Sequence, residues 1–181
     1  MSIRNNVTSW GTNATSGSVR SYRATNSGFS GQTYIGTTDN ALVNHTGLTP
    51  NDEYWFRGWM NNGGGLSNYM GSTRTAVTLP LAPVASTPTT ITSARVVIPT
   101  TINTGGGRYT ITKQYRIKET SGSYGSWTTY TGNDISIEGL SANTSYTVGV
   151  QSVTTAGTTV GGTTVFETKK VSGNFLPMMV R

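Results

Sequence analysis

Residues 139–150 read Gly-Leu-Ser-Ala-Asn-Thr-Ser-Tyr-Thr-Val-Gly-Val. A turn here precedes a strand in which Tyr146, Val148 and Val150 share one face, because side chains alternate along a strand. The pattern also occurs 92 residues earlier, from residue 47, where Gly, Leu, Asn and Tyr recur at the same spacing. Such an internal repeat indicates two copies of one structural unit. We therefore expect two small all-β domains.

The composition suits strands and turns. Hydrophobic residues make up 34% of the 181 residues and charged residues 11%, and Thr, Ser, Gly and Asn fill much of the remainder. These residue types form helices poorly, and the sequence has no convincing stretch of helical periodicity. Each half carries enough large apolar side chains for a thin sandwich core, although small domains bury proportionally less surface.

Charge and cysteine content exclude several classes of function. The chain has no cysteine, so neither a disulfide framework nor a thiolate metal site is possible. The formal charge of +6 comes from 13 basic and 7 acidic residues that are scattered along the chain, whereas nucleic-acid binding needs a clustered basic face. The first residues lack the apolar core of a signal peptide, and no stretch approaches the roughly 20 apolar residues of a membrane span. We expect no nucleic-acid partner and no membrane insertion.

The chain divides into four predicted regions. Residues 1–79 form the first unit, and 84–170 form the second. Between them, 80–89 is a linker that becomes the first edge strand of the second unit, because its three prolines keep it from pairing as a central strand. Residues 171–181 form an apolar C-terminal tail.

The repeated stretch resembles the fibronectin type III domain, an immunoglobulin-like fold. In that family, Gly-Leu-x-x-x-x-x-Tyr leads into the sixth strand, and its Tyr forms the tyrosine corner. Leu48 and Tyr54 occupy those places in the first copy. Leu140 and Tyr146 occupy them in the second, and Trp10 stands where the family has its core tryptophan. The resemblance covers nearly the whole chain and implies two tandem fibronectin type III-like β-sandwiches.

The first unit departs from the family at its start. Its tryptophan-bearing strand, residues 6–10, has so few residues before it that the family's first strand is missing or very short. A bare strand edge invites another chain to pair with it. We therefore hypothesise that a neighbouring subunit covers this edge. Pairing of residues 1–6 within their own sheet would count against that hypothesis.

The tail carries a second resemblance. Residues 170–181, Lys-Val-Ser-Gly-Asn-Phe-Leu-Pro-Met-Met-Val-Arg, look like the Val-x-Gly-x-Trp-x-Pro ends of phage tail and other virion proteins, with Phe175 in place of Trp. An exposed apolar run is disfavoured in water unless something buries it. The run either folds back onto the second unit or acts as a docking peptide. Its candidate docking residues are Phe175, Leu176, Met178 and Met179.

No catalytic, cofactor or metal site is visible. The lone histidine, His45, lies among polar residues before a turn, so we expect an exposed turn residue and neither a base nor a ligand. The acidic residues show neither the facing pair of a glycosidase nor the Asp-x-Asp-x-Asp spacing of a calcium loop. The triple-glycine stretches open no helix, so they are turns and not phosphate loops. We expect a non-enzymatic protein.

The repeated strand of the first copy has an unusual outward face. If Tyr54 and Phe56 point inward, then Trp55, Arg57 and Trp59 point outward. Outward tryptophans are uncommon, and Trp and Arg are enriched in interface hot spots. The alternative is a self-contained ladder with Arg57 stacked between the two rings; we favour an interface. The second copy, which we expect to face water, has at the matching places Thr147, Gly149 and Gln151.

These observations favour a structural role. We expect a phage virion protein that decorates or joins the capsid or tail, docking through its first unit to other virion structural proteins in many copies of a symmetric assembly. It would be assembled in the host cytoplasm and reside in the extracellular particle. The main alternative is a carbohydrate-binding or adhesion module in which Trp55 and Trp59 stack on a host-surface glycan. A spacer from a secreted polysaccharide-degrading enzyme would explain the fold but not the apolar tail.

Overall fold

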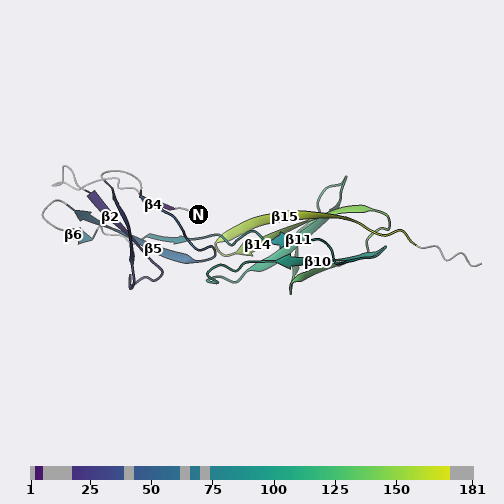
Figure 1. Cartoon of the computed structure of the whole chain (residues 1–181), viewed down its shortest axis with the longest axis horizontal. Coiled ribbons are helices and arrows are strands. Elements are labelled where there is room, and N and C mark those ends of the chain that lie inside the picture. Colours follow the sequence, from purple (N-terminus) through teal and green to yellow (C-terminus); the bar gives the residue numbers. More distant parts are fainter. Residues whose placement is uncertain (1–2, 6–17, 39–42, 62–65, 70–73, 172–181) are drawn as a thin grey trace, which may run out of the picture. The chain divides into compact units, whose positions relative to one another are not determined.

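The computed structural model describes residues 3–5, 18–38, 43–61, 66–69 and 74–171. Within these ranges the chain forms strands and no helix, and hence none that could cross a membrane (Figure 1). Contacts between backbone positions divide the chain into two compact units. Unit 1 comprises Met1–Pro80 with Thr104–Thr110, and unit 2 comprises Leu81–Asn103 with Ile111–Arg181. The prediction of an all-β chain is confirmed.

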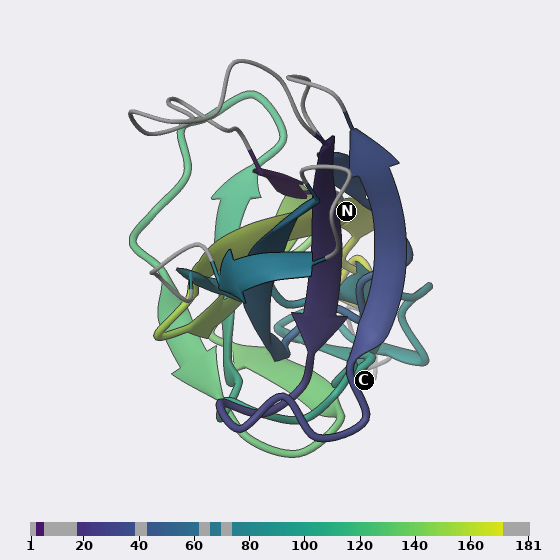
Figure 2. The same cartoon turned by 90° about the vertical axis from the view of Figure 1, so that its left-hand side faces the viewer.

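Unit 1 is built from two antiparallel sheets. Its strands are β1 (Ile3–Asn5), β2 (Ser18–Ala24), β3 (Thr33–Thr38), β4 (Val43–His45), β5 (Glu53–Asn61), β6 (Leu66–Tyr69) and β7 (Arg74–Val77). The larger sheet has the order β3-β2-β5-β6, and β7 also pairs with β5. Figure 2 shows β2 in purple beside β3 in blue. The smaller sheet consists of β1 and β4.

Unit 2 has the same two-sheet plan with longer strands. Its strands are β8 (Val84–Ala85), β9 (Thr90–Ile91), β10 (Arg95–Thr101), β11 (Thr112–Glu119), β12 (Thr128–Tyr130), β13 (Asp134–Glu138), β14 (Ser145–Thr154) and β15 (Gly157–Glu167). One sheet has the order β12-β11-β14-β15. The other has the order β13-β10-β8, and β9 also pairs with β10.

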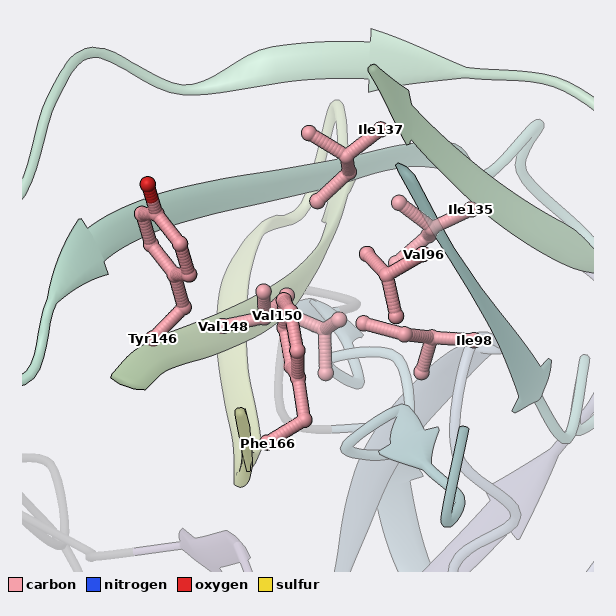
Figure 3. Close-up of a cluster of buried hydrophobic side chains, with 8 residues drawn as sticks. All are labelled: Val96, Ile98, Ile135, Ile137, Tyr146, Val148, Val150 and Phe166. Carbon is pink, nitrogen blue, oxygen red and sulfur yellow. The ribbon is translucent and has the colours of Figure 1, made fainter. Parts of the chain in front are cut away.

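The hydrophobic core of unit 2 lies between its two sheets. Alternate residues of β10 and β13 are buried, as expected of strands with one face on the core. Their apolar side chains meet those of β14 and β15, and burying each one stabilises the fold by roughly 1.5–3 kcal/mol. Figure 3 shows this cluster, which consists of Val96, Ile98, Ile135, Ile137, Tyr146, Val148, Val150 and Phe166.

The described core of unit 1 is smaller. Leu48, Tyr54 and Phe56 are buried together, and the half-buried Ala76 packs against them. Tyr54 and Phe56 alternate with the half-buried Trp55 and Arg57, so β5 turns its apolar residues inward as its sequence pattern predicted.

Unit 1 starts differently from the prediction. Residues 3–5 were placed before the first strand, but they form β1, in which Ile3 lies opposite His45 of β4. By the 92-residue offset of the repeat, β1 and β4 correspond to β10 and β13, which pair in the same antiparallel way in unit 2. The expected strand 6–10, with Trp10, lies outside the described residues. In unit 2, β10 also pairs with β8 and β9, whereas in the described part of unit 1 the pairing partner of β1 is β4 alone.

Candidate interaction surface

A hydrogen-bonded corner precedes β5 and β14. The Tyr54 hydroxyl accepts a hydrogen bond from the Thr49 backbone N–H at 2.9 Å. The Tyr146 hydroxyl accepts the equivalent bond from Ser141 at 3.0 Å. Each tyrosine thereby ties the start of its strand to the turn five residues before it. The corner fixes which residues of the strand face inward and which face outward.

The turns before the two tyrosines also correspond. Gly47 has a φ of 66° and Gly139 a φ of 72°, a left-handed conformation that glycine adopts without strain. The leucine that follows each glycine packs on the core of its unit: Leu48 is buried and Leu140 is half-buried. The short Gly-Leu motif therefore carries both the backbone reversal and its apolar anchor.

A buried threonine, which the sequence did not single out, completes each corner. The Thr78 hydroxyl donates to the Thr49 carbonyl at 2.7 Å and accepts from the Asp52 N–H at 2.8 Å. In unit 2, Thr168 makes the same two bonds to the corresponding carbonyl and N–H groups, at 2.6 and 3.0 Å. Both threonines lie just after the last strand of their unit, in a chain with many other threonines, so nothing in the sequence distinguishes them.

The outward side of β5 carries the predicted row of residues Trp55, Arg57 and Trp59, here called the β5 row. All three are half-buried. The guanidinium carbon of Arg57 lies 4.2 Å from the ring centre of Phe29 and 5.4 Å from that of Trp59. Its Nε and Nη2 both donate to the side-chain oxygen of Gln32, at 2.9 and 2.5 Å. Arg57 thus joins Trp59 to the β2–β3 turn.

The Trp55 end of the β5 row has a charged border. The guanidinium carbon of Arg108, which belongs to unit 1, lies 5.9 Å from the Trp55 ring centre. Arg108 also forms an ion pair with Glu53 at 2.9 Å. The row therefore combines partly exposed indole rings with cations, the combination that is enriched at the centres of protein interfaces.

The other predicted interface residues lie outside the described part of the chain. They are Phe175, Leu176, Met178 and Met179 of the tail.

The matching strand of unit 2 is covered, and the expectation that its outward residues face water is wrong. Thr147 and Gln151 are each only 8% exposed. A Cβ atom on Gly149 would lie 3.8 Å from the Tyr124 hydroxyl and 3.9 Å from a side-chain carbon of Arg116. Arg116 and Tyr124 therefore lie across the outer side of β14. The segment that contains Tyr124 is rich in Gly and Ser, so its sequence suggests a plain turn and gives no sign of this arrangement.

His45 is another correction. It was expected to be an exposed turn residue, but it is fully buried on β4. Its ring packs edge-on against Phe56, with ring centres 4.6 Å apart, and its Nε2 lies 2.9 Å from the Ser21 hydroxyl. Burial, and next the positive charge of Arg23, lowers the pKa of His45 to about 4. The Ser21–His45 pair is closed to substrate, since Ser21 is also buried.

The described residues contain no group of three or more His, Asp or Glu side chains that could hold a metal ion. Its partly exposed indole and guanidinium groups make the β5 row the candidate interaction surface of unit 1.

Comparison with known proteins identifies the fold. No family model and no curated protein matches the sequence. The structure is similar to a segment of two fibronectin type III domains from chicken tenascin, with a TM-score of 0.55 at 12% identity over 92% of each chain. The FN1–FN3 domains of chicken CNTN1 match 87% of this chain with a TM-score of 0.42 at 14% identity, and the chain spans 57% of the length of that structure. The tenascin likeness shows the predicted fold: tandem fibronectin type III-like, immunoglobulin-like β-sandwiches.

Proposed function

We propose that this chain is a non-enzymatic structural component of a phage virion, which decorates or joins the capsid or tail and docks to other virion proteins through unit 1. The fold supports a scaffold or adhesion role, because sandwiches of this kind serve widely as surface modules. Mechanistically, attachment would come from burial of apolar and strand-edge surface.

The observation that carries this proposal is the order of the β5 row. Arg57 is held by Gln32 and by two aromatic rings, so the side chains of the row are positioned before a partner arrives. Prepositioned aromatic and arginine side chains lose little conformational entropy on binding. Such residues contribute most of the binding energy at protein interfaces.

The pairing of residues 3–5 with β4 counts against a wholly bare sheet, but the other edge of β1 offers a second contact for the same partner. Where unit 2 has β8 and β9 beside β10, the described part of unit 1 has β4 as the one strand paired with β1. An extended segment of a neighbouring subunit could add a strand there through main-chain hydrogen bonds. The similarity of residues 170–181 to the ends of virion proteins is what favours a phage particle over another surface.

The test is attachment to purified particles. If the proposal holds, particles isolated on a density gradient contain the chain in many copies, and particles lacking it take it up when the purified chain is added. The double variant Trp55→Ala, Trp59→Ala should bind roughly 30-fold more weakly or worse, because truncation of a hot-spot residue costs about 2 kcal/mol or more. Trp127→Ala, a matched loss of an indole in unit 2, should attach as the native chain does.

Two results would overturn the proposal. One is absence of the chain from particles; the other is unchanged attachment of the double variant. The native chain and the double variant also test the competing carbohydrate interpretation. It requires that the isolated chain bind a glycan and that this binding be lost with Trp55 and Trp59.

A further inference from the structure

The outer face of the β11–β14 sheet in unit 2 carries a cluster of cations and aromatic rings, here called the β11 cluster: Arg116, Lys118, Tyr124 and Trp127. The guanidinium carbon of Arg116 lies 4.2 Å from the Tyr124 ring centre and 4.5 Å from that of Trp127. The ammonium nitrogen of Lys118 lies 5.1 Å from the Tyr124 ring centre. All four residues are half-buried, so the cluster rests on the sheet and remains open to solvent.

The strand register explains why these side chains gather. Arg116 lies opposite Gly149, and Lys118 lies opposite Thr147. Residues directly opposite each other in an antiparallel pair share one face of the sheet. Since Gly149 has no side chain and Thr147 a short one, the long side chains of β11 can lie across β14 beneath the Tyr124 ring.

Neither cation of the β11 cluster has an acidic partner among the described residues. The ion pairs found there join Arg95 to Glu138 at 3.6 Å and Arg108 to Glu53 at 2.9 Å. In addition, the buried Nε of Arg116 donates no hydrogen bond to the described part of the chain. Because Nε is buried, a ligand would meet the two terminal nitrogens of the guanidinium group, which together can bind a carboxylate through two hydrogen bonds.

The surroundings of the β11 cluster suit a sugar better than a protein. Interface centres between proteins are usually apolar and well packed. Here the exposed neighbours of the two rings are instead Ser123 and Ser126, while Thr147 and Gln151 of the strand beneath are buried. Exposed hydroxyl groups beside aromatic rings match a hydroxylated pyranose, and the two cations without carboxylate partners match an acidic one.

We propose that the β11 cluster binds a carboxylated oligosaccharide. Arg116 would hold the carboxylate, Lys118 would add a second positive charge, and the Tyr124 and Trp127 rings would pack against the sugar. This site lies on unit 2 and does not depend on the docking proposed for the β5 row.

The probe is hexagalacturonate, titrated into the full chain and followed by calorimetry and by amide chemical shifts. We expect binding that weakens as salt is added, with shifts concentrated on β11, β14 and the segment around Tyr124. The neutral methyl ester of the same hexamer should bind much more weakly. Hexaglutamate, which carries the same charge on a peptide, should also bind more weakly than the sugar.

Matched variants locate the site. Arg116→Gln should weaken binding about tenfold or more, because hydrogen bonds between charged groups are the strong ones. Lys118→Gln should weaken it roughly two- to fivefold. Arg95→Gln removes the same charge from the other sheet of unit 2, so it should leave the affinity unchanged. Thermal unfolding shows whether each variant is folded, and Arg116→Lys, which keeps the charge but loses the planar edge, replaces Arg116→Gln if that variant does not fold.

The proposal fails if hexagalacturonate does not bind or if its methyl ester binds equally well. It also fails if hexaglutamate binds as tightly, since the face would then recognise acidic polypeptide. An equal loss of affinity in Arg95→Gln and Arg116→Gln would show binding to net charge alone. None of these results bears on attachment through Trp55 and Trp59.

Discussion

β5 and β14 start from the same corner and then face different surroundings. In both units a tyrosine hydroxyl accepts from the turn, and a buried threonine ties the turn to the last strand. Beyond the corner, the outward Trp55, Arg57 and Trp59 of β5 stay partly exposed. On β14 the outward positions are buried under side chains of the same unit.

This comparison separates the hydrogen-bonded corner, which both units share, from the outward positions of the strand, which differ between them. The corner is a set of backbone hydrogen bonds closed by two hydroxyl groups, so any departure leaves buried polar groups without partners. The outward positions touch side chains alone, and they can diverge without disturbing the corner. In this chain the outward row of one copy stays partly exposed, and the other copy has covered its strand with Arg116 and Tyr124.

The corner threonines should produce the largest effect on stability. Thr168→Val removes a hydroxyl that both donates and accepts, so the partly buried Ser141 carbonyl and Thr144 N–H lose this partner. We expect it to lower the free energy of unfolding of unit 2 by about 2–4 kcal/mol. Thr78→Val should cost unit 1 a similar amount. Amide hydrogen exchange in urea, resolved for each unit, measures both.

The serine variants at the two positions are the controls. Thr168→Ser and Thr78→Ser keep the hydroxyl and should recover most of the loss. If the two valine variants differ by more than about 1.4 kcal/mol, a factor of ten in the unfolding equilibrium, the corners are not energetically equivalent.

Acid should destabilise unit 1 through His45, a residue type that unit 2 lacks. The pKa of His45 is about 4 in the folded chain, below its value of about 6.5 when unfolded. The unfolded chain therefore binds the proton more readily, so stability is complete above pH 6.5 and falls as the pH drops towards 4. We expect a loss of about 2–3 kcal/mol in unit 1 by pH 4.

Unit 2 serves as the internal reference for carboxylate titration, and His45→Phe removes the histidine while keeping a ring beside Phe56. Unfolding of the two units is followed from pH 7.5 to 4. If unit 1 of the native chain loses no more stability than unit 2 over this range, His45 is not the cause of acid destabilisation. So would an acid loss that persists undiminished in His45→Phe.

The features predictable from the sequence were those set by backbone geometry. Gly47 and Gly139 stand where φ is positive, and Tyr54 and Tyr146 stand where a hydroxyl can reach back to the turn. Such positions tolerate few residue types, so they recur visibly in a repeat. The alternation of β5 could be predicted for the same reason, because period-2 patterning follows from the pleat.

The features that could not be predicted depend on contacts between distant segments. His45 is polar and flanked by polar residues, and only the pairing of β4 with β1 and its packing on Phe56 places it inside. Tyr124 sits in a glycine-rich turn, and its position over Gly149 depends on how that turn folds back across the sheet. Neither arrangement leaves a periodic signal in the sequence.

The smallest effect expected is on the β5 row itself. Arg57→Ala removes the stacking on Phe29 and Trp59 and the bonds to Gln32. Phe29 is buried, but Arg57 and Trp59 are half-buried and Gln32 is exposed, so unit 1 should lose only about 0.5–1 kcal/mol. The free energy of attachment to particles should fall by much more than this loss of stability, because Trp59 is no longer held in place by Arg57.

Gln151→Ala is the matched change on β14, where the amide is buried, and it should cost unit 2 about 1–2 kcal/mol without affecting attachment. Urea unfolding and particle binding measure the two variants side by side. If Arg57→Ala destabilises unit 1 by several kcal/mol and attachment falls only in proportion, the row supports the fold and is not kept for a partner.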